Sequence, residues 1–170
     1  MAKTHFIGGI HGVGKGTICK KVCDQFDIIY LSASELLKWN EISEIDNKKV
    51  VDINNTQDRL IAGFRNATKG NSVYLLDGHC SLFNALGEIE RVPLETFEKI
   101  APNSITVVTE KPEIIKSRLE ERDNQLYDLE VLLEMQNIEI EYAEKISSHL
   151  NIPFVVIKNG DFQPLIDVLK

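Results

Sequence analysis

Short apolar runs recur along the chain, and the longer segments between them have helical periodicity. The runs lie at residues 4–8, 28–31, 72–77, 105–109 and 153–157. After the first run, Ile18, Val22 and Phe26 stand four positions apart, which is the spacing of one face of a helix. The pattern therefore predicts five strands that alternate with helices.

A long helix is predicted to begin near residue 129. Its buried face is expected to consist of Leu129, Leu132, Leu133, Gln136, Ile140 and Ala143. The five predicted strands are continuous in apolar residues and do not alternate with polar ones, which is typical of parallel strands covered on both faces. The predicted fold class is therefore α/β, and the irregular polar segments 40–55 and 87–93 are predicted to be surface excursions.

Composition and charge exclude several classes of partner. The 170 residues suit one domain, residues 1–170. The 26 acidic and 19 basic residues give a net charge of −7, which argues against nucleic acid as a partner. The apolar runs are too short to span a bilayer, and three cysteines without a CxxC pair favour a reducing compartment. We therefore expect a cytoplasmic protein with no nucleic-acid or membrane partner, and a homo-oligomer is left open.

The strongest motif lies between the first predicted strand and the first predicted helix. It has the GxxxxGK spacing of a Walker A loop. Glycines let such a loop turn tightly, the helix N-terminus adds its positive dipole, and the lysine can reach the outer phosphates of a nucleotide. The predicted phosphate-binding residues are Gly9, Gly12, Val13, Gly14, Lys15, Gly16 and Thr17.

Two other nucleotide-binding classes fit this loop less well. The dinucleotide pattern GxGxxG fails, because its last position falls on Thr17 or Cys19. A GTPase switch protein is expected to carry a hydroxyl for Mg²⁺ directly after the lysine. Here Gly16 stands at that position and the hydroxyl follows at Thr17, so a GTPase is disfavoured.

The sequence GxGKGT is similar to the loop of nucleoside monophosphate kinases, and the chain most resembles the compact archaeal-type adenylate kinases. Besides the loop, residues 57–60, 74–79, 112–118 and 156–159 carry the resemblance, which covers most of residues 4–160. It implies a P-loop NTPase fold of three α/β/α layers, with a five-stranded parallel sheet of order 2-3-1-4-5. It also implies ATP and Mg²⁺ as cofactors.

Asp77 ends the third apolar run, as a Walker B acid does. A carboxylate at the C-terminal edge of a parallel strand lies beside the nucleotide crevice, so Asp77 and Thr17 are the candidate metal residues. An aspartate that caps the next turn is the alternative. The resemblance also implies that His79 contacts acceptor or phosphate and that Asn159 contacts the cofactor. A structural histidine is the alternative at position 79.

Arginines are the candidates for stabilising a migrating phosphoryl group. Arg118 and Arg122 stand four positions apart and project from one helix face. The resemblance places them at the start of a reduced lid, residues 118–128, where Gln125 and Tyr127 replace arginines of the family. A solvated helix face with salt bridges is the alternative.

The resemblance implies that residues 32–68 form an arm that binds the acceptor. Its candidate residues, with His79, are Ser34, Lys38, Gln57, Arg59 and Arg65. Arginine holds a monophosphate through two parallel N–H bonds, and ordinary helix-surface charges are the alternative for both arginines.

These features predict an ATP-dependent kinase-like enzyme with Lys15, Asp77, Arg118 and Arg122 as its catalytic residues. The expected acceptor is a nucleoside monophosphate or another small molecule. The rival hypothesis is a regulatory module that binds or slowly hydrolyses ATP and acts through a protein partner. The lid, in which Gln125 and Tyr127 replace arginines, favours the module. The arginines of the predicted acceptor arm favour the enzyme.

Overall fold

A central parallel sheet organises the computed structural model, which describes residues 1–37, 53–83, 86 and 88–170. The sheet consists of β1 (Lys3–Gly8), β2 (Ile29–Ser32), β3 (Val73–Asp77), β6 (Ser104–Val108) and β7 (Phe154–Ile157). A separate antiparallel pair consists of β4 (Ser81–Phe83) and β5 (Ile89–Arg91). The helices are α1 (Lys15–Gln25), α3 (Ile53–Ala67), α4 (Leu94–Ile100), α5 (Pro112–Asp123), α6 (Leu129–Leu150) and α7 (Gln163–Leu169).

The strand order of the sheet is β2-β3-β1-β6-β7, with every neighbouring pair parallel. The predicted numbering, 2-3-1-4-5, becomes 2-3-1-6-7 because the sequence pattern missed β4 and β5, while the five predicted strands keep their predicted places in the sheet. Each has only three residues, too few to show a clear alternation of polar and apolar positions. The segment 87–93, predicted as an irregular excursion, therefore contains a strand.

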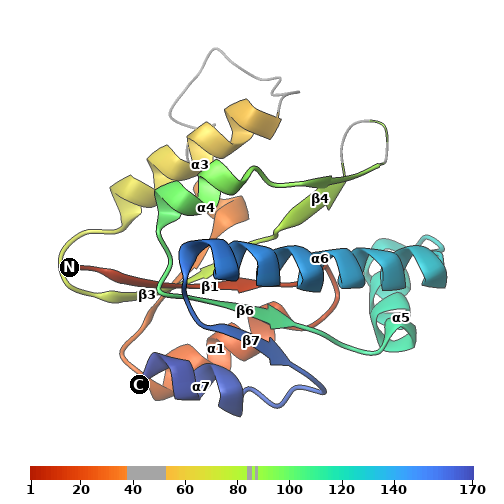
Figure 1. The fold of residues 1–170 in the computed structure, drawn as a ribbon. Helices are drawn as coiled ribbons and strands as arrows, with labels where there is room; N and C mark the ends of the chain where they lie inside the picture. Colours follow the sequence, from red (N-terminus) through yellow and green to blue (C-terminus); the bar gives the residue numbers. More distant parts are fainter. Residues whose placement is uncertain (38–52, 84–85, 87) are drawn as a thin grey trace.

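Two layers of helices cover the sheet (Figure 1), because successive residues of a strand point to opposite faces. Phe6 and Leu76 pack into a cluster with residues of α3, α4 and α6. Their neighbours Ile7 and Leu75 pack into a second cluster with residues of α1, α5 and α7. The three-layer α/β/α arrangement follows from this alternation.

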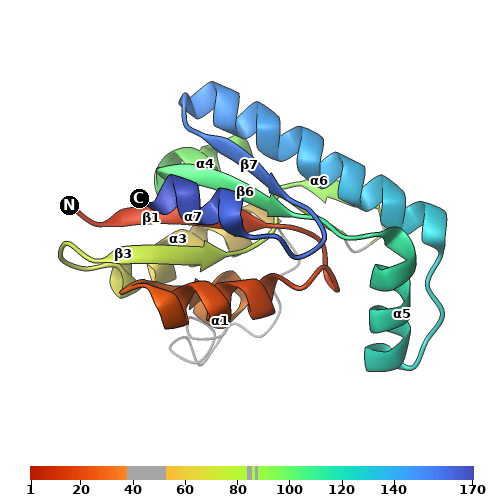
Figure 2. The ribbon, with the colours of Figure 1, turned by 90° about the horizontal axis from the view of Figure 1, so that it is seen from below.

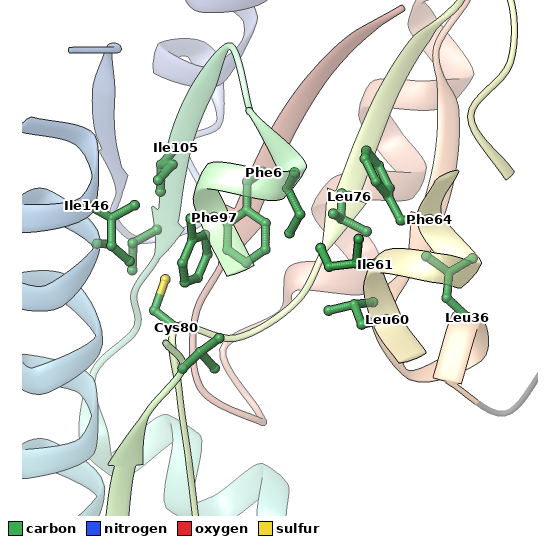
Figure 3. Close-up of a cluster of buried hydrophobic side chains, with 14 residues drawn as sticks. Phe6, Leu36, Leu60, Ile61, Phe64, Leu76, Cys80, Phe97, Ile105 and Ile146 are labelled. Atoms are coloured by element: carbon green, nitrogen blue, oxygen red, sulfur yellow. The ribbon is translucent and has the colours of Figure 1, made fainter. Parts of the chain in front are cut away.

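The core on the α4 and α6 side is built around two aromatic rings (Figure 3). Phe6 and Phe97 meet edge to face with their centroids 5.2 Å apart. Cys80 and Ile146 lie in the same cluster and are fully buried. Full burial of a large apolar side chain contributes about 1.5–3 kcal/mol to folding, so this cluster holds α4 and α6 against the strands.

The helix α5 lies beyond the carboxyl end of β6, and α6 runs back from there over the sheet, at a steep angle to α5 (Figure 2). Pro112 begins α5, Asn124 ends it in a left-handed conformation, and the Asp128 side chain accepts a hydrogen bond from Val131 N at the start of α6. On α6 the buried face differs from the predicted one. Leu129 and Leu133 are exposed, and the charged residue Glu139 is fully buried instead.

Among the helices that the structure describes, none has the length and apolar character needed to span a bilayer.

Candidate functional site

A pocket of about 740 Å³ opens at the carboxyl ends of β1, β2 and β3. Ligands of α/β sheets bind at this edge. The pocket is lined by Ile10, His11, Gly12, Val13, Gly14, Lys15, Gly16, Thr17, Ile18, Lys21, Tyr30, Ser32, Ala33, Ser34, Asp77, Gly78, His79, Glu110, Arg118 and Gly160. Ten of the predicted site residues therefore line one pocket: Gly12, Val13, Gly14, Lys15, Gly16, Thr17, Ser34, Asp77, His79 and Arg118.

The glycine loop has a backbone that side chains would not permit. Gly9, Gly12 and Gly14 have φ values of 143°, 87° and 95°, a region that L-residues rarely adopt. A Cβ added at Gly9 would also lie 2.7 Å from the carbonyl oxygen of Val108. Gly14 is the N-cap of α1, so the unpaired N–H groups of the first helical turn face the pocket edge. The loop is built to receive an anion.

Lys15 places its ammonium group at the base of this loop. Its Nζ donates a 2.6 Å hydrogen bond to Gly9 O and lies 3.7 Å from Asp77 Oδ1. Burial lowers the pKa of Lys15, while Asp77 and Glu139 oppose that shift. The side chain is only 8% exposed, so its charge acts in a partly dehydrated site, where it attracts an anion more strongly than in water.

Asp77, at the end of β3, has both carboxylate oxygens engaged. Tyr30, on the neighbouring strand β2, donates a hydrogen bond of 2.8 Å to Oδ2, while Lys15 lies near Oδ1. Burial and this bond raise the pKa of Tyr30. The sequence reasoning did not single out Tyr30, and the register Tyr30↔Leu75 across β2 and β3 is what brings it to Asp77.

His79 lies against the glycine loop. Its Nδ1 is 2.8 Å from Gly9 O, and because a carbonyl can only accept, Nδ1 carries the proton and donates it. Burial lowers the pKa of His79 to about 3, with smaller contributions from Lys15 and His11. The His11 ring lies 4.5 Å from the His79 ring. At neutral pH His79 is therefore uncharged, with an unprotonated Nε2.

The two lid arginines differ in position. Arg118 lines the pocket, donates a 3.1 Å hydrogen bond to Gly12 O and lies 3.7 Å from Glu110 Oε2. Arg122 instead pairs with Asp123 through two bonds of 2.6 and 2.8 Å and is not among the lining residues. Arg122 therefore fits the alternative, a helix face with salt bridges, while Arg118 lies at the pocket.

The residues predicted to bind the acceptor do not all lie at the pocket. Ser34 lines the pocket and its Oγ lies 2.9 Å from Ser32 Oγ. Gln57, Arg59 and Arg65 are on α3 and are not among the lining residues. Lys38 lies outside the described residues, as does part of the predicted arm, residues 38–52.

Two further residues predicted to bind the cofactor lie beside the pocket but are not among its lining residues. Gly9 is not a lining residue, but its carbonyl binds both Lys15 and His79. Asn159 is exposed, has a φ of 54° and directly precedes the lining residue Gly160.

Oxygen donors that fit a hard cation are present at the same edge. Asp77 and Thr17 both line the pocket, and carboxylate and hydroxyl oxygens are the ligands that Mg²⁺ accepts beside substrate phosphates. Within residues 1–37, 53–83, 86 and 88–170, no group of three or more His, Cys, Asp or Glu side chains could hold a metal ion. Asp77 and Thr17 are therefore the lining residues whose chemistry fits a Mg²⁺ ion.

Glu139 of α6 is a residue that the sequence reasoning missed. Its carboxylate accepts hydrogen bonds from the backbone N–H groups of Gly9, Cys80 and Ser81. The available signal was its spacing, since Glu139 stands three positions after Gln136 and four before Ala143, both predicted to be buried. An acidic residue inside an apolar face is unusual and points to a buried network of hydrogen bonds.

Comparison with known proteins supports this architecture. A model of the family described as AAA domain matches residues 8–132. No curated protein matches the sequence. A gluconokinase from Sinorhizobium meliloti 1021 is similar in structure, with a TM-score of 0.54, 10% identity and coverage of 98% of this chain and 87% of its own. An uncharacterized protein from Eubacterium ventriosum ATCC 27560 gives a TM-score of 0.51 at 16% identity, covering 98% and 95%. At these identities the likeness concerns the fold.

Proposed function

Because this chain belongs to the AAA domain family, we propose that it is an ATP-dependent kinase that transfers the γ-phosphoryl group to a small molecule. The single observation that carries the proposal is the position of Lys15, whose buried ammonium group lies between the glycine loop and Asp77 at the base of the pocket. A cation held there has no anionic partner in hydrogen-bond contact among the described residues, since Asp77 Oδ1 is 3.7 Å away. A phosphate would supply that partner.

ATP and Mg²⁺ are the cofactors that this arrangement favours. The backbone of residues 9–14 and the first turn of α1 would hold the phosphates, and Lys15 would neutralise their charge. Asp77 and Thr17 would hold the Mg²⁺, which neutralises charge on the outer phosphates when bound. Phosphoryl transfer depends mainly on positioning and charge stabilisation, and Arg118 is the cation on the lid side of the pocket that can supply the rest.

The acceptor is the finer part of the proposal. A nucleoside monophosphate is the acceptor that the resemblance to adenylate kinases implies. The hydroxyl groups of Tyr30, Ser32 and Ser34 line the pocket near Asp77, which suits a polyhydroxylated acceptor equally well, and a structural neighbour is a gluconokinase. Nucleoside monophosphates and sugar acids therefore both belong in the test.

The proposal is tested by ATP titration and by a coupled assay of ADP release. The acceptor panel comprises nucleoside monophosphates, nucleosides and small hydroxy acids, gluconate included. We expect wild-type protein to bind ATP and at least one acceptor to raise ADP release well above basal hydrolysis. In Lys15→Ala the dissociation constant for ATP should rise by about 10- to 100-fold, the usual effect of losing a charge-assisted hydrogen bond.

Lys20→Ala is the matched control, because Lys20 is exposed on the same helix and does not line the pocket. It should bind ATP like the wild type. Equal ATP binding by wild type and Lys15→Ala would contradict the assignment of the nucleotide site.

A second function, a regulatory module that binds or slowly hydrolyses ATP, is favoured by the lid. Arg122 is engaged with Asp123, and Gln125 and Tyr127 bond to each other through their side chains, so Arg118 is the lid cation that lines the pocket among the described residues. ATP binding without stimulation by any acceptor of the panel would support the module over the kinase.

A further inference from the structure

The helix α6 carries two buried polar residues one turn apart, and both bond to backbone that follows a strand. Gln136 donates 2.9 Å to Glu110 O and accepts 3.0 Å from Glu110 N, just beyond β6. Glu139 bonds to backbone just beyond β1 and β3. The helix α6 thus braces three strand ends around the pocket, and Glu139 contacts the two that carry the glycine loop and Asp77.

The Glu139 carboxylate is saturated with donors. Oε1 accepts from Gly9 N at 3.2 Å and from Cys80 N at 2.7 Å. Oε2 accepts from Ser81 N at 2.9 Å and from Ser81 Oγ at 2.8 Å. The side chain is fully buried, so each of these four bonds replaces water that cannot reach the site.

The carboxylate stands where the strand pairing of β1 and β3 ends. Their register finishes at Ile7↔Asp77, and the last bond between the two backbones runs from Gly78 N to Ile7 O at 3.0 Å. Beyond it, Gly9 and Cys80 each direct an N–H group to the same carboxylate oxygen. A single atom of Glu139 therefore sets the separation of the two loops that follow these strands.

This separation matters for the pocket because Gly9 is bonded on both sides. Its N–H is held by Glu139, while its carbonyl accepts from Lys15 Nζ and from His79 Nδ1. His79 directly precedes Cys80, the other residue held by Oε1. A displacement of the carboxylate would therefore change the positions of Lys15 and His79 relative to one another.

Packing alone does not explain a carboxylate at this position. A buried charge is costly unless hydrogen bonds compensate it, and apolar residues of similar volume often serve a core equally well. All four donors to Glu139 are uncharged. What the carboxylate provides, and an apolar residue lacks, is a fixed geometry for the backbone N–H groups of Gly9, Cys80 and Ser81, the first two of which lie beyond the end of the β1–β3 pairing.

We propose that Glu139 is a positioning residue for the nucleotide site: it fixes the distance between the start of the glycine loop and the loop after β3, so that Lys15 and His79 converge on Gly9 O. This inference rests on the proposed function, because its consequence is measured as ATP affinity. The effect is exerted through Gly9 and Cys80, without contact between Glu139 and the ligand.

The test is Glu139→Gln, which keeps the shape of the side chain. The four hydrogen bonds of the wild type use both carboxylate oxygens, and glutamine offers only one acceptor oxygen. Affinity for ATP is measured well below the unfolding temperature of every variant, and amide hydrogen exchange is followed at Gly9, Cys80 and Ser81. We expect the dissociation constant for ATP to rise about 10-fold, with faster exchange at these amides. A variant that is less heat-stable but binds ATP within about 2-fold of wild type would overturn the proposal, because the role would then be structural only.

Glu141→Gln is the matched control, since Glu141 is exposed on the same helix and pairs with Lys145. It should change neither ATP affinity nor exchange at Gly9. Lys15→Ala, measured in parallel, separates the two hypotheses. If Lys15→Ala loses ATP affinity and Glu139→Gln does not, the positioning role is rejected and the nucleotide site stands. If Lys15→Ala keeps its ATP affinity, the nucleotide site itself is rejected.

Ser81→Ala keeps the proposal testable if Glu139→Gln does not fold. It removes one donor to Oε2 and leaves the three backbone bonds in place. We expect a smaller rise in the dissociation constant for ATP, about 3-fold, with faster exchange at Gly9. Unchanged ATP affinity and unchanged exchange at Gly9 would count against transmission through the carboxylate.

Discussion

The two ends of the pocket are built differently. At the phosphate end, Lys15 is 8% exposed and lies 3.7 Å from Asp77, and both Lys15 and His79 donate to Gly9 O, so that these contacts join the ends of β1 and β3. At the lid end, Arg118 is 47% exposed and Arg122 is 56% exposed. Arg122 is held by a surface pair with Asp123, which contributes little to stability, while Arg118 contacts Glu110 and Gly12 O. The groups of the phosphate end are buried and bonded to one another, whereas the lid arginines are exposed.

This difference indicates that the two ends of the pocket would have different roles, one in nucleotide binding and the other in phosphoryl transfer. A preorganised cradle binds the ground state of a nucleotide, and a cation that exchanges partners can be recruited as charge develops during transfer. Removing a group from the phosphate end should therefore weaken ATP binding or the fold. Removing Arg118 should mainly lower turnover.

The largest expected effect is on turnover, in Arg118→Ala. We expect the acceptor-stimulated rate of ADP release to fall by about 10³-fold, the usual effect of losing an arginine that stabilises the transition state, with a much smaller change in ATP affinity. Arg122→Ala is the control from the same helix, because Arg122 pairs with Asp123 and does not line the pocket. Equal losses in the two variants would remove the distinction between these arginines.

The next effect is on the fold, in Gly9→Ala. The added Cβ would meet Val108 O at 2.7 Å in a backbone with a φ of 143°, so we expect the free energy of unfolding to fall by about 2–3 kcal/mol. Gly16→Ala is the comparison, since nothing lies within 4 Å of the position of its Cβ. Chemical denaturation measures both. If the two alanines cost the same, the glycine loop is not as rigid as its contacts indicate.

A smaller effect is expected in Asp77→Asn. It should raise the Mg²⁺ concentration needed for half-maximal binding of ATP by about 10-fold, while metal-free ATP binding changes little. Titration of the nucleotide complex with Mg²⁺ measures this. Equal weakening with and without Mg²⁺ would assign Asp77 to orienting Lys15 alone.

The last expected effect, which is spread over several pH units, is on the pH dependence of stability. The pKa of His79 is lowered to about 3 in the folded protein, against about 6.5 in an unfolded chain. Between these values the unfolded chain binds the extra proton, so stability falls as the pH is lowered from about 6.5 towards 3, by at most about 1.4 kcal/mol per pH unit. His79→Asn should flatten this part of a urea-denaturation profile. An unchanged slope would show that His79 takes up a proton in the folded state.

Local chemistry explains the parts of the fold and the site that the sequence determined. The five strands of the sheet begin and end within one residue of the predicted runs, because a continuous apolar run of that length suits a strand covered on both faces. The glycine loop was predictable for a similar reason, since its spacing and its glycines specify a turn that only a few backbone conformations satisfy. Asp77 could be placed at the pocket because it directly follows an apolar run.

Tertiary structure alone decided which distant residues meet at this edge. Tyr30 reaches Asp77 through strand register, and Glu139 reaches Gly9 across 130 positions of the chain. Arg118 and Arg122 share one helix, yet only Arg118 contacts the glycine loop, at Gly12 O. Periodicity fixes which face of a helix a residue occupies, but the partner of that face depends on how helices and strands pack. For that reason the sequence determined the cradle, and the packing of α5 and α6 against the strand ends determined which side chains complete it.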